Sequence, residues 1–169
     1  MKTTNRIVSF VVLGLLFLTS CSTEPEETTL SDTKTVIDNS AVYNYSATEI
    51  ETLDLITNYR KSIGLNTLVK INFISLKSEE HVNYMIANNV VNHNDFVSRS
   101  NEIIRVLGAR NVSENIAYNY QTPSGAFDAW LKSPSHKENI VGDFTHFGIS
   151  IRQDAATGKK YYVNIFAKI

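Results

Sequence analysis

Four short motifs in the second half of the chain constrain its fold more than any other feature. They combine histidine, acidic, asparagine and aromatic residues in a fixed order, over residues 93–99 (HNDFVSR), 113–117 (SENIA), 130–140 (WLKSPSHKENI) and 144–148 (FTHFG). Three of the four histidines, His93, His136 and His146, fall inside these motifs. Because these side chains are far apart along the chain, only a tertiary fold can bring them into one site.

In this order the motifs resemble the CAP superfamily, which includes cysteine-rich secretory proteins, antigen 5 and plant pathogenesis-related proteins. The similarity is greatest to its short bacterial, SCP-like form, and it runs from about residue 50 to residue 166. It implies an α+β fold, an α-β-α sandwich with a small antiparallel sheet between helices, as one domain over residues 46–169. The resemblance says little about biochemistry, because one fold can carry many functions.

The first 20 residues predict a bacterial lipoprotein signal peptide. Lys2 and Arg6 give a basic start, residues 7–18 form an apolar stretch, and small residues stand before Cys21. That stretch is too short for a transmembrane helix, which needs about 20 apolar residues. The alternative is an ordinary secretory signal with a chance cysteine. We expect cleavage before Cys21 and acylation of it, for example with palmitate, and therefore anchoring on the outer membrane or cell surface of a bacterial envelope.

Composition characterises the chain beyond the signal. Residues 21–45 are polar and lack apolar periodicity, which predicts a disordered tether. Removing Lys2 and Arg6 from the 16 basic residues leaves 14 against 17 acidic ones, a net charge of −3. No basic stripe is present, so we expect no nucleic-acid partner. Cys21 is the single cysteine, which excludes an internal disulfide framework. We expect a monomer that relies on its packed core.

Apolar spacing and capping residues predict the elements of the domain. Ser46 and Glu49 form a capping-box pattern, and Ser133-Pro134 reads as a serine cap followed by proline at the first helical position. Three expected helices begin near Ser46, Pro123 and Ser133, and two more cover residues 71–89 and 102–107. The expected strands cover residues 112–120, 147–152 and 161–167, and the last two are expected to form an antiparallel hairpin.

The resemblance also implies a central cleft. It places His93 and Glu114 there, with His146 or His136 as the second histidine. Imidazoles and carboxylates are zinc ligands, so His93, Glu114, His146 and His136 form the candidate metal set, with Zn²⁺ as the possible cofactor. A histidine held by a carboxylate is alternatively a general base, which makes His93, Glu114 and His146 the catalytic candidates.

Other polar residues of the motifs have structural interpretations. His81 is expected to be a core histidine bonded to backbone, and Arg99 to pair with an acid or a backbone carbonyl near the cleft. Asn115 suits a turn or bulge that aims Glu114 inward. Trp130 is expected in the core. Ser133 lies near His136, but the pattern is better explained as a helix start than as a nucleophile.

Two functions stay open at this point. The first is a membrane-anchored, extracytoplasmic binding module whose His/Glu cleft holds a metal, a lipid, or a peptide or protein. The alternative is a metal-assisted peptidase or hydrolase that uses the same cleft. The sequence offers no confident nucleophile, which favours binding, and whether the chain is an enzyme is not decided.

Overall fold

The computed structural model describes residues 41–169. The predicted signal peptide, Cys21 and residues 21–40 of the tether lie outside the described residues, so these stay predictions. The described part begins a little earlier than the expected domain. Tyr43 is buried, and its hydroxyl donates a 2.7 Å hydrogen bond to Oε1 of Glu49. Residues 41–45 contain no helix or strand, and the side chains of Tyr43 and Tyr45 pack on the domain, so the packed part begins before residue 46.

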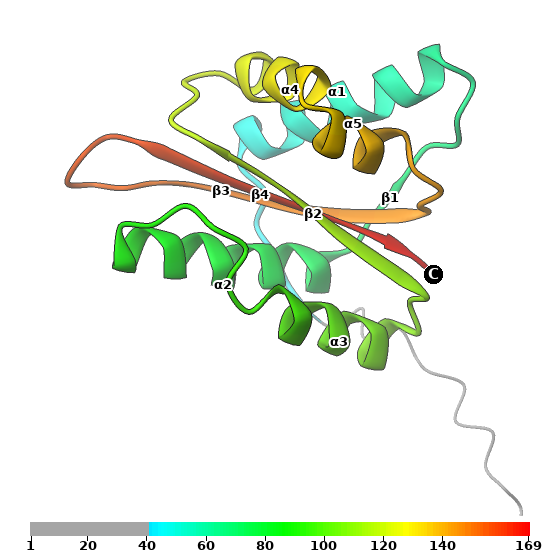
Figure 1. Ribbon diagram of the computed structural model, residues 1–169, viewed down its shortest axis with the longest axis horizontal. Coiled ribbons are helices and arrows are strands. Elements are labelled where there is room, and N and C mark those ends of the chain that lie inside the picture. Colours follow the sequence, from blue (N-terminus) through cyan, green and yellow to red (C-terminus); the bar gives the residue numbers. More distant parts are fainter. Residues whose placement is uncertain (1–40) are drawn as a thin grey trace, which may run out of the picture. The chain divides into compact units, whose positions relative to one another are not determined.

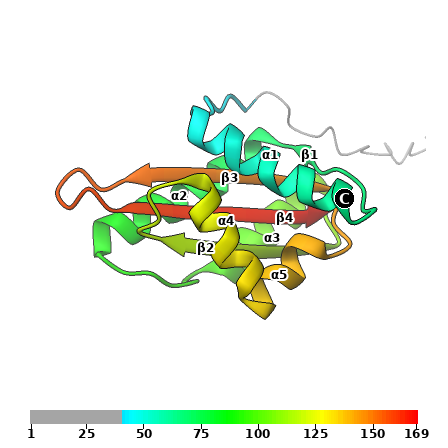
Figure 2. The ribbon, with the colours of Figure 1, turned by 90° about the horizontal axis from the view of Figure 1, so that it is seen from above.

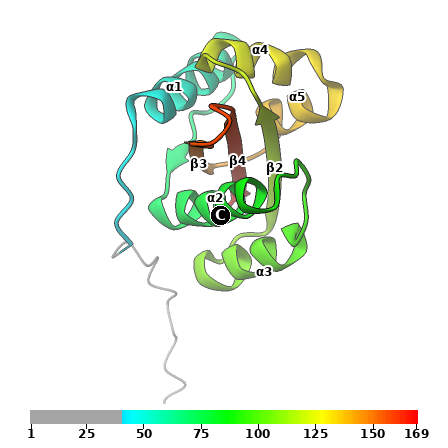
Figure 3. The ribbon, with the colours of Figure 1, turned by 90° about the vertical axis from the view of Figure 1, so that its left-hand side faces the viewer.

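Five helices and four strands form a three-layer α+β sandwich in residues 41–169, which confirms the expected fold class. Helices α1, α4 and α5 cover one face of the sheet, and α2 and α3 cover the other (Figures 1 and 3). The elements are α1 Ala47–Ser62, β1 Val69–Lys70, α2 Asn72–Asn88, α3 Phe96–Leu107, β2 Asn111–Tyr118, α4 Pro123–Lys132, α5 Pro134–Val141, β3 His146–Gln153 and β4 Lys160–Lys168.

The sheet is mixed rather than purely antiparallel. Its strand order is β1-β3-β4-β2, and β3 and β4 form the predicted antiparallel hairpin, with β2 antiparallel to β4 (Figure 2). The short strand β1 pairs in parallel with β3, Val69 opposite His146. Two parallel strands need a long crossover connection, and here the elements from α2 to α5 form it. Strand β2 is left at one edge of the sheet.

The helix starts show which sequence signals work locally. Ser46 and Glu49 form both hydrogen bonds of the capping box before α1. Helix α3 begins at Phe96, six residues earlier than predicted, after Asp95 in the left-handed region. Its buried side includes Arg99 along with Ile103 and Leu107. Because Arg99 takes an inner position where an apolar residue is usual, the apolar spacing does not reveal the first turns of α3.

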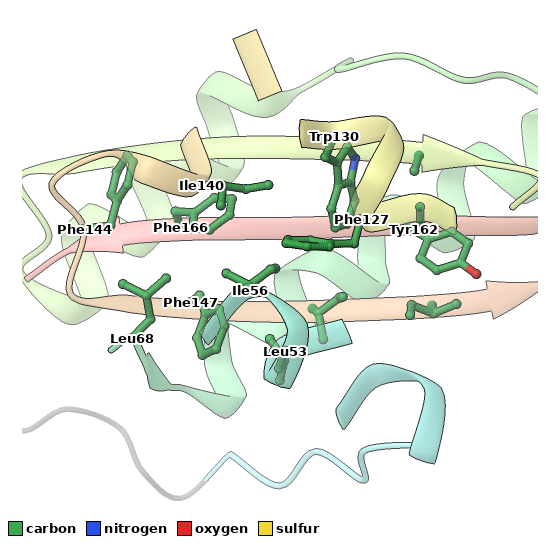
Figure 4. Close-up of a cluster of buried hydrophobic side chains, with 14 residues drawn as sticks. Leu53, Ile56, Leu68, Phe127, Trp130, Ile140, Phe144, Phe147, Tyr162 and Phe166 are labelled. Carbon is green, nitrogen blue, oxygen red and sulfur yellow. The ribbon is translucent and has the colours of Figure 1, made fainter. Parts of the chain in front are cut away.

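Two apolar cores lie on the two faces of the sheet. The first joins α1, α4 and α5 to the sheet around Trp130, which is 1% exposed and donates from Nε1 to Ile116 O at 2.9 Å (Figure 4). The second packs α2 and α3 on the other face. Trp130 is thus in the core, as predicted. Among the described helices, none is long and apolar enough to cross a membrane.

Candidate functional site

His93, Glu114 and Arg99 form a hydrogen-bonded chain at the edge of the sheet. His93 Nδ1 lies 2.8 Å from Oε1 of Glu114, and Arg99 Nη2 donates to both oxygens of that carboxylate, at 3.1 and 2.9 Å. The side chain of Glu114 is 1% exposed, whereas that of His93 is 53% exposed. A buried carboxylate neutralised by arginine therefore orients a histidine that solvent can reach. The structure thus brings His93 and Glu114 together and gives Arg99 an acid partner.

Asparagines hold the segment that carries His93. Helix α2 ends at Asn88, and the next residue, Asn89, is in the left-handed region. Asn92 O lies 2.7 Å from Nε2 of His81, and Asn94 Nδ2 donates to the hydroxyl of Tyr84 at 2.9 Å. Asn94 O accepts a 2.6 Å hydrogen bond from Nη1 of Arg99. Sequence reasoning missed Asn92 and Tyr84, although the Asn-His-Asn run was a visible signal of a polar, turn-forming segment.

Neighbouring residues of β2 serve opposite faces of the sheet, as side chains of a strand must. Glu114 meets α3, while Asn115 meets α5: its Nδ2 donates to His136 O at 3.0 Å, and its Oδ1 accepts from Asn139 at 2.8 Å. Asn115 pairs regularly with Asn164, so the expected turn or bulge at this position is wrong. Regular strand geometry already directs Glu114 toward Arg99, and Asn115 docks α5 instead.

The structure brings His136, and not His146, to the neighbourhood of His93. Burial lowers the pKa of His136 below its usual value, and the nearby His93 lowers it further. His146 opens β3 and is separated from β2 by strand β4. Its Nδ1 contacts the hydroxyl of Thr145 at 2.8 Å, and burial lowers its pKa. Of the two second-histidine candidates, His136 is therefore the one near enough to His93 to be affected by its charge.

His81 matches its structural interpretation, and Ser133 begins helix α5 as predicted but without a side-chain cap. His81 is 2% exposed, bonds to a backbone carbonyl and stacks on Tyr84 with ring centroids 5.7 Å apart; burial lowers its pKa. Ser133 occupies the N-cap position of α5, yet its hydroxyl makes no capping hydrogen bond. It contacts Nδ1 of His136 at 2.8 Å instead.

The candidate zinc ligands do not assemble into a site with three protein ligands. Within residues 41–169, no group of three or more histidine, cysteine, aspartate and glutamate side chains lies close enough to hold one ion. Both oxygens of Glu114 already accept from Arg99, and His146 lies two strands away from β2. The residues present therefore do not fit the expected three-ligand arrangement.

An open pocket lies next to His93. It is lined by His93, Asn94, Asp95, Phe96, Val97, Ser98 and Asn101. Val97 is 72% exposed, and Phe96 is partly buried against the second core. The pocket thus joins one oriented imidazole to a surface that is more apolar than polar. Such an arrangement can receive a hydrogen-bond donor and an adjacent apolar group.

This fold and this site define a class of protein. The model of the cysteine-rich secretory protein family, CAP, matches residues 53–166. The chain therefore belongs to the CAP family, as the motif order predicted.

Solved structures and a curated relative resemble this chain. An outer surface protein from Borrelia burgdorferi is 22% identical with a TM-score of 0.61, over 70% of this chain and 90% of that one. An extracellular SCP-domain protein from Bacillus anthracis is 22% identical with a TM-score of 0.63, over 72% of this chain and 40% of that one. The uncharacterized membrane protein YlbC of Bacillus subtilis is 38% identical over 56 residues, which is 32% of this chain. The chain spans only 14% of that relative's length. At 22% identity, the structures show a shared fold alone.

Proposed function

We propose that this CAP domain is a binding module of the bacterial cell envelope, and that its cleft beside His93 takes an extended peptide. The observation that carries the proposal is the contact of His93 with Glu114, fixed by Arg99. In the neutral imidazole Nδ1 then donates to the buried carboxylate, which leaves Nε2 as an acceptor. A peptide supplies the matching N–H donors.

The lining of the pocket favours a peptide over an acyl chain. Its surface is more apolar than polar, and Phe96 and Val97 lie in it beside Asn94, Ser98 and Asn101. A peptide matches both parts, because a backbone N–H can donate to His93 and an apolar side chain can lie on the apolar surface. An acyl chain has no donor for the oriented imidazole and would cover it without a partner, which is unfavourable.

The envelope location rests on two supports. Residues 1–21 have the pattern of a lipoprotein signal that ends in an acylated cysteine. Two structurally similar proteins are named as an outer surface protein and an extracellular protein. Lipid at Cys21, membrane attachment and a monomeric state belong to this proposal. The alternative of metal-assisted hydrolysis would use the same His93–Glu114 contact with His93 as a general base, but within residues 41–169 no three-ligand group that could hold the metal accompanies it.

The experiment is an NMR titration of the isotope-labelled chain with a pool of random-sequence, N-acetylated octapeptides. We expect backbone amide shifts confined to residues 93–101. His93→Ala should weaken binding by about 5–10-fold, since a hydrogen bond contributes about 1 kcal/mol. His146→Ala is the matched control and should leave binding unchanged. Shifts elsewhere, or equal affinity in His93→Ala, would refute the proposal; shifts with phospholipid micelles but not with peptides would indicate a lipid site.

Zinc binding to the same cleft is tested separately. With His146 remote, we expect zinc binding to be weak, to require His93 and to survive His146→Ala. Because zinc needs neutral imidazole, binding should weaken as pH falls below the usual histidine value of about 6.5. Calorimetric titration with zinc chloride at pH 7.5 and pH 5.5 measures this. Tight binding that requires His146 would show that the cleft rearranges around the metal.

A further inference from the structure

We infer that Ser133 and His136 form a nucleophile–base pair that can take an acyl group from an activated ester. Ser133 Oγ lies 2.8 Å from Nδ1 of His136, within the range seen between serine nucleophiles and their bases. With Nδ1 as the acceptor, the imidazole proton resides on Nε2. This activity is distinct from peptide binding at His93.

Capping does not account for the Ser133 hydroxyl. Within residues 41–169, two other hydroxyl residues show the geometry of a helix cap: Ser46 Oγ accepts from Glu49 N at 3.2 Å, and Thr122 Oγ1 accepts from Gly125 N at 3.2 Å. Ser133 stands at the equivalent position of α5 without any such bond. Besides His136, its hydroxyl has one longer contact, 3.4 Å to Ser135 Oγ. The hydroxyl is therefore directed to the imidazole rather than to the helix.

Both partners are held in place by their backbones. Ser133 ends α4 and begins α5: its N–H donates to Ala129 O and Trp130 O at 3.2 Å, and its carbonyl accepts from Lys137 N at 2.9 Å. The carbonyl of His136 accepts from Asn115 Nδ2 at 3.0 Å, which ties the first turn of α5 to β2. Figure 2 shows this corner between α4 and α5. Neither side chain depends on a free loop for its position.

Ser133 also borders a pocket in which an ester could lie. This pocket of about 470 Å³ is lined by Tyr120, Gly125, Asp128, Ala129, Lys132 and Ser133. Ser133 is partly exposed, and Tyr120 is 39% exposed. The size of the pocket and its aromatic wall suit a short acyl group on an aryl leaving group.

The chemical step conserves atoms and charge. Ser133 Oγ attacks the ester carbonyl, the new Oγ–C bond forms, and His136 Nδ1 takes the hydroxyl proton. The C–O bond to the aryl group then breaks, the aryloxide leaves, and the His136 imidazolium gives its proton to solvent. Water next attacks the acyl-serine while neutral His136 takes a proton from it. The acyl C–Oγ bond breaks, His136 returns its proton to Oγ, and the acid leaves as a carboxylate and a solvent proton.

The test uses p-nitrophenyl acetate with the full chain, read by nitrophenolate release and by mass spectrometry of the peptides. We expect one acetyl group, on Ser133. Ser133→Ala should abolish it, and His136→Gln should slow it by about 100-fold or more, as for loss of a general base. Ser135→Ala is the matched control and should react as the wild type does.

A second comparison separates chemistry from folding. Ser46→Ala removes a true cap, so it should lower the melting temperature and leave acetylation at Ser133 intact. Ser133→Ala should do the reverse. Acetylation on Lys132 instead of Ser133, no acetylation at all, or a His136→Gln rate within about threefold of wild type would each overturn the inference.

Discussion

Two buried glutamates organise this chain at the scale of single residues. Glu114 accepts from Arg99 and contacts His93, which makes it part of the site. Glu49 is 0% exposed and accepts from Tyr43, from Ile151 N at 2.9 Å and from Arg152 Nη1 at 2.7 Å. One carboxylate thus ties the entry of the domain to strand β3. A buried charge is tolerated only with such partners.

Glu49 predicts a pH dependence of stability. Burial raises its pKa, but hydrogen bonds from Ser46 N, Tyr43, Ile151 N and Arg152 outweigh burial, so the net pKa is lowered from 4.5. The unfolded chain therefore binds this proton more readily than the folded one. The contribution of Glu49 to folding stability is fully present above the unfolded pKa of 4.5, and it is lost as the pH falls through the lower pKa of the folded state. Glu49→Gln should cost about 2 kcal/mol at pH 7 and less at pH 3.

Urea unfolding of both proteins at pH 7, 5, 4 and 3 measures this difference. Glu51→Gln, an exposed neighbour on the same helix, is the control and should have little effect at any pH. A difference between wild type and Glu49→Gln that stays constant down to pH 3 would contradict the prediction.

At the scale of elements, helices α4 and α5 are attached to the sheet in different ways. Helix α4 places Trp130 in the apolar core and adds one hydrogen bond, from Nε1 to Ile116 O at 2.9 Å. Helix α5 relies more on amides, since Asn115 binds both His136 O and Asn139. The apolar attachment is the stronger source of stability, and the polar one determines where His136 and Ser133 lie.

Trp130→Ala should therefore destabilise the domain by about 3–5 kcal/mol, the usual range for a buried aromatic side chain. This is a large part of the stability of an ordinary domain, so the melting temperature should fall strongly. Leu131→Ala is the matched control on the same helix; Leu131 is only partly buried, and its loss should cost less. Equal melting temperatures for wild type and Trp130→Ala, measured by calorimetry, would be incompatible with the packing of α4.

At the scale of the whole molecule, we propose that residues 21–40 connect the CAP domain to a lipid anchor. Cys21→Ala should block both acylation and cleavage and leave the unprocessed precursor. More than one acyl chain is needed for stable attachment, so loss of lipid should release any processed protein from the membrane. Metabolic labelling with a palmitate analogue and fractionation of the envelope measure both effects. Normal labelling and cleavage of Cys21→Ala would exclude the lipoprotein assignment.

The sequence by itself determined the family, the layered α+β class, most helix and strand positions and the Trp130 core, because motif order, caps and apolar spacing are local properties. It also predicted that His93 and Glu114 meet. Only the tertiary structure decided which second histidine lies nearer to them: strand β4 separates His146 from β2, whereas Asn115 brings α5 and His136 to that edge. The start of α3 was missed because Arg99, a charged residue, is buried there through its ion pair with Glu114 on the next element, β2. The role of the Ser133 hydroxyl was likewise decided by geometry, since its choice between the helix amides and His136 depends on side-chain direction, which residue spacing does not encode.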